Sequence, residues 1–417
     1  MRTLPIVLLF VAMTFTSWGL YGPVLHEGQH GLGVAGQPSS LRPFICVGIS
    51  YFLIGVLVPS MLLRFRGERG HWTITGAFWS FMAGIAGAFG ALGITLAFKF
   101  GGRPVFVMPL VFGLAPVMST LVAMWMTKTF RQASPVFIAG VIIVAIGAAG
   151  VMYSRPVQPA PAPMPGPTAV APAADGVLEQ AEHAATSLLD RLAGLTLVLL
   201  SIALTGCCWG SYGPVLHKGQ MKMGGSRLRP FLCVGLAYFV IAVLVPLALM
   251  RLFVEPGTWT FHGTVWSLAG GAAGALGALG IIMAFNFGGK PIYVMPLVFG
   301  GAPVINTFVT ILHEGTYQQT TSLFYASLML VIGGAVTVLL FAPRGKPEPT
   351  PPKKEPKSKP KPKPEEPAAA AKQPSTPKPA SATPANERSA AEPIAPKEDS
   401  SANTGSNQAT PDESEST

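Results

Sequence analysis

The chain carries two copies of one hydrophobic unit, at residues 1–153 and 191–343, and this duplication limits the possible folds more than any other feature. The segment WGLYGPVLHEGQ, which begins at Trp18, returns as WGSYGPVLHKGQ at Trp209. LRPFICVG and RPVFVMPLVFGLAPV return in the same order as LRPFLCVG and KPIYVMPLVFGGAPV. Two like halves of this kind pack against each other in many membrane proteins, with a path across the membrane between them.

The composition indicates that most of the chain faces lipid. Apolar residues make up 50% of it and charged residues only 12%, although the C-terminal segment is rich in Lys and Glu. Little ionisable surface therefore remains for a soluble body. The four cysteines lie in apolar stretches without a CxxC or Cys/His pair, which argues against a disulfide scaffold and against a zinc site.

Each copy contains five apolar stretches of about 18–25 residues, the length that a helix needs to cross a bilayer. Backbone groups cannot remain unpaired in lipid, and the stretches lack the alternation of barrel strands, so helices are expected. The sequence predicts an all-α integral membrane protein with ten transmembrane helices. The predicted segments are 4–26, 43–63, 75–98, 104–127 and 136–153 in the first copy, and 193–216, 230–250, 262–285, 291–312 and 322–342 in the second.

An odd number of helices per copy predicts that the two copies cross the membrane in opposite senses, as inverted repeats. With the N-terminus inside, fifteen Lys and Arg fall in the inner loops and at the start of the tail, against six in the outer loops. Basic loops favour the cytoplasm. Three of four pairs of equivalent loops have also exchanged their charge between the copies, and only the pair KFGGRP and NFGGKP runs slightly the other way. We therefore expect a multi-pass protein of the inner (plasma) membrane with both termini in the cytoplasm.

Two segments lie outside the repeats. Residues 154–190 form a Pro/Ala-rich linker, of which VLEQAEHAATSLLD has helical periodicity and either lengthens the sixth helix or lies along the outer surface. Residues 344–417 form a Lys/Pro-rich tail with almost no large apolar residue, for which we expect disorder. The tail is either a solvated spacer or a binding segment for a partner, and its basic start favours anionic lipid.

The segment AFKFGGRPVFVMPLVFGLAPVMSTLVAMW resembles the passage from the third to the fourth helix of EamA-like domains in the drug/metabolite transporter superfamily. GVIIVAIGAAGVM resembles the fifth helix of these domains, and WGLYGPVLHEG resembles the first. The Trp-Gly-x-Tyr start is also similar to the glucose/rhamnose uptake branch. The resemblance covers all ten helices and implies two inverted five-helix repeats. Glu27 stands where the family often has a Lys, and the tail is not part of the family pattern, so the substrate class does not carry over.

Glycines recur every three residues in the third segment of each copy, which predicts a strip where another backbone comes close. The strip is explained either by tight packing, which we favour, or by a seam along which the halves move. Prolines inside the fourth segment of each copy free carbonyl groups, which either line a pore or only mark a kink. The glycines are Gly84, Gly87, Gly90 and Gly93, matched by Gly271, Gly274, Gly277 and Gly280, and the prolines are Pro109 and Pro116, matched by Pro296 and Pro303.

The first segment of each copy carries an aromatic and imidazole face that could bind an organic solute. An aromatic wall with hydroxyl and imidazole groups suits sugars, nucleosides or amphipathic metabolites, whereas an interfacial aromatic belt is the alternative. Residues next to the helix prolines and one polar residue of the ninth segment complete the set. The candidate substrate-binding residues are Trp18, Tyr21, His26, Met108, Pro109, Trp209, Tyr212, His217, Met295, Pro296 and Asn306.

The ten segments contain no Asp, Glu, Lys or Arg, which argues against symport coupled through a carboxylate. Facilitated diffusion, exchange or coupling through histidine is preferred. No Walker loop, HExxH or GxSxG is present, so we expect no enzyme activity, cofactor, metal or nucleic acid. The expected function is transport of a small polar or amphipathic organic solute by alternating access. The alternatives are a membrane scaffold whose tail recruits a partner, and a flippase for lipid-linked intermediates.

Overall fold

The computed structural model describes residues 4–34, 37–65, 67–154, 174–315 and 317–343. All ten predicted segments are helical, and within the described residues ten helices have the length and apolarity to cross a membrane. The chain therefore fits a multi-pass integral membrane protein. Most of the linker and the whole C-terminal tail lie outside the described residues. The disorder predicted for the tail therefore stays a prediction.

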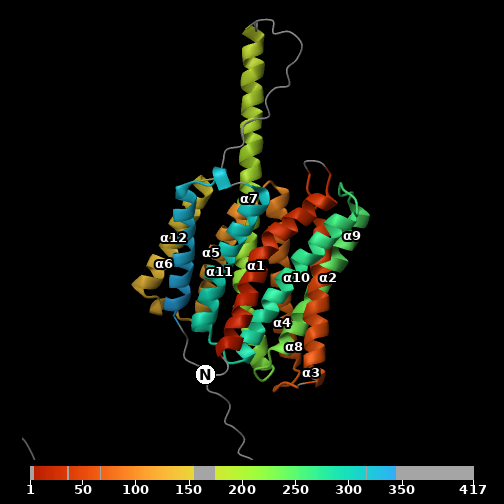
Figure 1. Ribbon diagram of the computed structural model, residues 1–417, viewed down its shortest axis with the longest axis vertical. Helices are drawn as coiled ribbons and strands as arrows, with labels where there is room; N and C mark the ends of the chain where they lie inside the picture. Colours follow the sequence, from red (N-terminus) through yellow and green to blue (C-terminus); the bar gives the residue numbers. More distant parts are fainter. Residues whose placement is uncertain (1–3, 35–36, 66, 155–173, 316, 344–417) are drawn as a thin grey trace, which may run out of the picture. The chain divides into compact units, whose positions relative to one another are not determined.

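The two copies contain the same series of elements (Figure 1). The second membrane helix of each copy consists of two α-helical parts with a π-helical turn between them, and short 3₁₀ turns, η2 (Phe130–Gln132) and η4 (Tyr317–Gln319), precede the last helices. The first copy holds α1 (Leu4–Leu32), α2 (Leu41–Phe52), η1 (Leu53–Leu57), α3 (Val58–Phe65), α4 (Ile74–Lys99), α5 (Pro104–Thr127) and α6 (Pro135–Tyr153). The second holds α7 (Ala174–Lys222), α8 (Leu228–Phe239), η3 (Val240–Leu244), α9 (Val245–Leu252), α10 (Phe261–Asn286), α11 (Pro291–Glu314) and α12 (Ser322–Phe341).

Local sequence explains where several helices begin and bend. Thr73 and Thr260 cap α4 and α10 by accepting hydrogen bonds from backbone amides three residues ahead. Pro59 and Pro246 follow the π-helical turns in equivalent positions. Because proline has no N–H, the carbonyl four residues earlier loses its α-helical partner, which favours the wider turn.

Several helices extend beyond the predicted segments, so the predicted bounds were too short at those ends. The apolar segments lack charged residues, but α1 continues through Glu27 and α11 ends at Glu314. Arg42 lies in the first turn of α2 and is buried. Hydropathy marks only the part of a helix that fits the hydrocarbon layer, and these ends project past it. The segment VLEQAEHAATSLLD lengthens the sixth membrane helix, since α7 runs for 49 residues.

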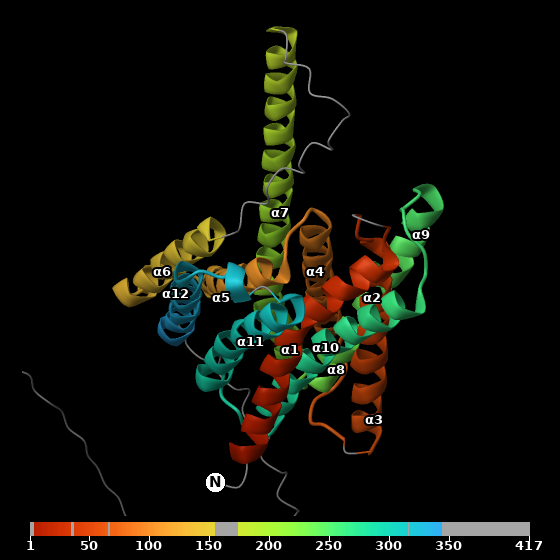
Figure 2. The same cartoon turned by 45° about the horizontal axis from the view of Figure 1, so that its top comes forward.

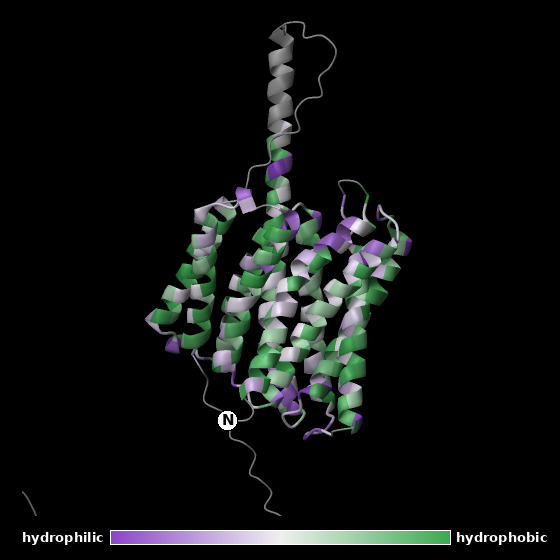
Figure 3. Cartoon of the chain, viewed as in Figure 1, coloured by the Kyte–Doolittle hydropathy of each residue, from purple (hydrophilic) through white to green (hydrophobic). Residues whose placement is uncertain are grey.

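The helices of the two copies alternate in the bundle. α1 packs against α10 and α11 of the second copy, and α7 packs in the equivalent way against α4 and α5 of the first. α6 and α12 pair along one side, and the second membrane helices pair along the other (Figures 1 and 2). Hydrophilic residues gather at the two ends of the bundle, while its flanks are apolar (Figure 3).

The glycine strips lie in tight contact with the first helix of the other copy, a partner that the sequence did not predict. The indole N–H of Trp18 donates to the carbonyl of Gly274 at 3.1 Å, and Thr14 donates to the carbonyl of Gly277 at 3.1 Å. The second copy repeats both bonds at 3.1 Å, from Trp209 to Gly87 and from Thr205 to Gly90. α4 and α10 are continuous helices through these glycines. We call these two contacts, α1 with α10 and α7 with α4, the glycine seams.

Equivalent residues of the two copies contact each other where the second membrane helices of the two copies pack together. Tyr51 stacks on Tyr238 with ring centroids 3.8 Å apart and an interplanar angle of 3°. Phe52 and Phe239 follow with centroids 4.7 Å apart. The two copies therefore contact each other through equivalent residues at this point.

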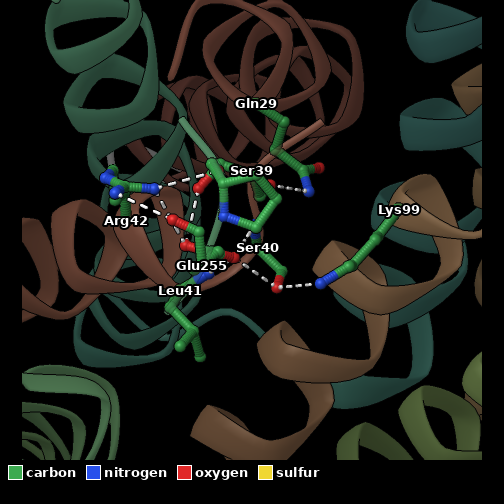
Figure 4. A network of polar contacts seen from close by, with 8 residues as sticks. Gln29, Ser39, Ser40, Leu41, Arg42, Lys99 and Glu255 are labelled. Atoms are coloured by element: carbon green, nitrogen blue, oxygen red, sulfur yellow. Dashed lines mark hydrogen bonds and ion pairs between the residues drawn. The ribbon is translucent and has the colours of Figure 1, made fainter. Parts of the chain in front are cut away.

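A carboxylate from the other copy caps each second membrane helix. Figure 4 shows the cap at α2. Glu255 accepts hydrogen bonds from the backbone amides of Ser40 and Leu41 at 2.6 and 2.9 Å, and it pairs with Arg42 at 3.3 Å. Glu68 repeats the arrangement at α8, where it accepts from the amides of residues 227 and 228 and pairs with Arg229 at 3.8 Å. A carboxylate at a helix N-terminus satisfies free amides and opposes the positive end of the helix dipole.

Alanine at Gly90 or Gly277 is expected to destabilise the protein by about 1–3 kcal/mol, because the added methyl group would overlap the indole of Trp209 or Trp18. Thermal unfolding in detergent measures the change. Gly333→Ala is the control, since a methyl group there meets no atom within 4 Å. Equal midpoints for Gly90→Ala, Gly277→Ala and the control would contradict the tight packing of the glycine seams.

Glu255→Gln is expected to cost about 2 kcal/mol at neutral pH, because it weakens charge-assisted hydrogen bonds at the start of α2. Burial raises the pKa of Glu255, but hydrogen bonds from Leu41, Ser40 and Ser39 outweigh burial and lower the pKa below its ordinary value of 4.5. The stabilisation is therefore present above pH 4.5 and is lost as the pH falls through the lowered pKa. Unfolding midpoints of wild type and variant should converge in acid, and a gap that widens there would contradict the assignment.

Candidate functional site

A cavity of about 410 Å³ opens at the end of the bundle where α1 and α11 end and α5 begins. It gathers ionisable side chains from these three helix ends. His262, at the start of α10, contacts its rim through Glu27. We call the cavity and this rim residue the histidine mouth. Its ionisable residues are His26, Glu27, His30, Arg103, His313 and Glu314, together with His262.

The charged groups of the histidine mouth tie the three helix ends together. Arg103, at the N-terminus of α5, forms an ion pair with Glu314 at the end of α11. Glu27 binds two imidazoles through its two carboxylate oxygens, His262 Nε2 at 3.1 Å and His313 Nε2 at 3.5 Å. The mouth therefore has one carboxylate paired with a guanidinium and one that meets only imidazoles.

His26 forms the floor of the histidine mouth. Its ring stands edge-on to His30, with centroids 4.6 Å apart, and to Phe98 at 5.1 Å. Its Nδ1 is buried and has no hydrogen-bond partner among the described residues. A polar ligand in the mouth could supply that partner, because buried polar atoms are normally satisfied.

A polar group lies below the mouth, toward the core. Asn306 is fully buried, donates its Nδ2 to the carbonyl of Pro104 at 3.0 Å, and leaves Oδ1 without a partner among the described residues. A Cβ on Gly22 would lie 2.8 Å from this Oδ1 and 2.6 Å from Met108, so α1, α5 and α11 meet there. The hydroxyls of Thr307 and Thr310 are likewise buried and unpartnered in the described part. α11 thus presents a polar stripe that continues into the mouth.

The predicted binding residues fall into separate groups. His26 lies in the histidine mouth, and Met108 and Asn306 lie directly below it. Tyr21 contacts the ring of Trp209, with centroids 5.9 Å apart. The structure places the remaining predicted residues as follows: Trp18 packs against Phe112 and Phe299, Tyr212 lies at Gly87, Pro109 is buried, Met295 and Pro296 are half-buried on α11, and His217 is exposed near the end of α7.

The two tryptophans have a structural role that the sequence did not show. Each donates its indole N–H to a glycine carbonyl of the other copy. The indole N–H groups are therefore hydrogen-bonded inside the glycine seams, whereas the ring faces of the two tryptophans contact other aromatic side chains.

Sequence reasoning missed most of the histidine mouth. Glu27, Arg103 and Glu314 lie just beyond the ends of the predicted apolar segments, so hydropathy does not point to them. The comparison of the copies held a signal, because Glu27 is replaced by Lys218 and Glu314 by Thr127 at the equivalent positions. A residue type that differs between two otherwise matched copies indicates a role in only one of them.

A second cavity, of about 450 Å³, lies at the opposite end of the bundle. Its lining includes Glu68 and Arg227, and the Glu68 carboxylate already caps α8. Among the residues that the structure describes, no group of three or more His, Cys, Asp or Glu is arranged to hold a metal ion. The histidine mouth is therefore the better candidate for a solute site.

No protein-family model matches the chain, and no curated protein matches it. A solved structure described only as "Crystal structure of protein" is similar, with 16% sequence identity and a TM-score of 0.47. The match covers 81% of this chain and 98% of that chain. The resemblance to EamA-like domains thus remains a prediction from the sequence.

Trp18→Phe and Trp209→Phe are each expected to lower stability by about 1 kcal/mol, because each removes one indole hydrogen bond and keeps an aromatic ring in place. The two losses should be similar, since the bonds are equivalent. Unfolding midpoints of the two variants in detergent test this. Wild-type stability in both variants would show that the indole N–H groups do not hold the seams.

Proposed function

We propose that the protein is a membrane transporter that moves a small polar or amphipathic organic solute by alternating access between two inverted halves. The observation that carries the proposal is the reciprocal packing of the two copies. Each first helix lies against the third and fourth helices of the other copy, and Tyr51 stacks on its counterpart Tyr238. α1 begins and α7 ends at the same end of the bundle, which fits an opposite sense of crossing (Figure 1). Inverted halves around a central site are a recurrent transporter design.

The solute path in this proposal follows α11 from the histidine mouth to Asn306. α1, α5, α7 and α11 are neighbours and would form its walls. Buried polar atoms without partners, at His26, Asn306, Thr307 and Thr310, would bind polar groups of the solute in turn. Tyr21 and Trp209 would provide an aromatic surface deeper in the bundle.

In the proposed orientation, both termini lie on the cytoplasmic side of the inner (plasma) membrane. The histidine mouth then faces the outside. Fifteen basic residues would then lie inside and six outside. Two of the outer six are neutralised by ion pairs, Arg42 with Glu255 and Arg103 with Glu314.

Alternating access requires that contacts at one end open while contacts at the other end close. At the histidine mouth, the contacts of Glu27 with His262 and His313, and of Arg103 with Glu314, would open. The glycine seams would remain packed as the helices rock, because small residues let backbones slide without changing their separation.

Full-length protein in proteoliposomes should take up at least one of labelled glucose, rhamnose, uridine and choline faster than protein-free vesicles. Asn306→Ala should lower the initial rate by roughly tenfold, the effect of losing about one buried hydrogen bond. Ser119→Ala, at the equivalent position of the first copy, is the matched control and should retain the rate.

Two results would count against transport. Uptake at the level of protein-free vesicles for all four solutes would overturn the proposal. Movement of fluorescent lipid head groups without solute uptake would favour a flippase instead.

A further inference from the structure

One half of the protein holds a cation of its own on an aromatic ring. The ammonium group of Lys218, near the end of α7, lies 3.6 Å from the ring centroid of Trp79 on α4. A cation over the face of tryptophan is attracted by the electron-rich ring, and tryptophan binds cations better than the other aromatic side chains. Within the chain itself, this end of the bundle therefore shows an occupied ammonium site.

The other half keeps the tryptophan but reverses the charge. Trp266 on α10 is the counterpart of Trp79, and Glu27 on α1 is the counterpart of Lys218. The helices are also equivalent, since α1 lies on α10 as α7 lies on α4. At the histidine mouth a carboxylate thus takes the sequence position of the built-in ammonium, and the helix that packs against it keeps the tryptophan.

Two imidazoles connect Glu27 to this ring. His262 and His313 have ring centroids 5.9 and 6.5 Å from Trp266, and both contact the Glu27 carboxylate. The Glu27 side chain is 35% exposed, so a ligand in the mouth can reach it.

The other charges of the mouth leave Glu27 as the group that lacks a permanent cation. Arg103 is paired with Glu314, and His26 and His30 are the remaining titratable groups of α1 that face the cavity. A guanidinium already bound to a carboxylate is poorly suited to recognise a second one. The charge balance therefore favours a ligand that carries an ammonium group without a carboxylate.

We propose that the histidine mouth binds the ammonium group of an organic amine, with Glu27 as the counterion and Trp266 as the aromatic face. This inference rests on the proposed function, because it names the class of solute that enters the transport path. The amine takes the position that Lys218 holds over Trp79 in the other half.

Choline and 3,3-dimethylbutan-1-ol are the probes, because the alcohol has the shape of choline with a carbon in place of the charged nitrogen. Calorimetric titration of the full-length protein in detergent is expected to give at least tenfold tighter binding of choline than of the alcohol at about pH 8. Phenethylamine and 2-phenylethanol form a second pair, with a primary ammonium.

Three variants and a control locate the site. Glu27→Gln and Trp266→Leu should each weaken choline binding at least tenfold. Glu27→Lys recreates the arrangement of the other half, so its own ammonium should occupy the ring and abolish choline binding. Trp79→Leu changes the counterpart at the opposite end and should leave choline affinity unchanged. Unfolding midpoints show that each variant is folded, and Glu27→Gln preserves shape if the other variants are unstable.

Two outcomes overturn the inference: amines that bind no more tightly than their neutral analogues, or choline affinity within twofold of wild type in Glu27→Gln. The binding measurements and the uptake measurements can fail independently of each other. Uptake of glucose or uridine without amine binding keeps transport and removes the amine site. Amine binding that depends on Glu27, without flux of any solute, keeps the site and removes transport.

Discussion

Close contact between backbones in the glycine seams is the interaction on which the bundle depends. Lipid tails are as apolar as the side chains they would replace, so helices in a membrane associate through packing and hydrogen bonds. Glycine lets α1 approach α10 closely enough for Trp18 and Thr14 to reach main-chain carbonyls, and α7 approaches α4 in the same way. Those contacts hold the first helix of each copy against the third and fourth membrane helices of the other copy.

The histidine mouth is a consequence of the same exchange of helices. Because α1 lies on α10 and α11, the carboxylate near its end meets imidazoles from both. At the other end, α7 brings Lys218 to Trp79. One packing arrangement thus creates two chemically different ends from nearly identical sequences, and a protein that treats its two sides differently needs such an asymmetry.

Much of the framework could be predicted from the sequence, because it depends on local patterns. Apolar length predicts the ten helices, and the three-residue spacing from Gly84 to Gly93 predicts a packing strip. The partner of that strip could not be predicted, since it depends on which helices become neighbours. The mouth was missed for a related reason: Glu27 and Glu314 lie beyond the apolar segments and come together only through tertiary contacts.

The stacked pair of Tyr51 and Tyr238 has a consequence for how the two copies can diverge after duplication. Glu27 and Lys218 have different neighbours, imidazoles of the second copy for Glu27 and Trp79 of the first copy for Lys218, and they carry opposite charges. Each of these tyrosines instead stacks on its own duplicate. A new side chain at either position has to be accommodated by the other, so these two sites evolve as a couple while the periphery is released to specialise.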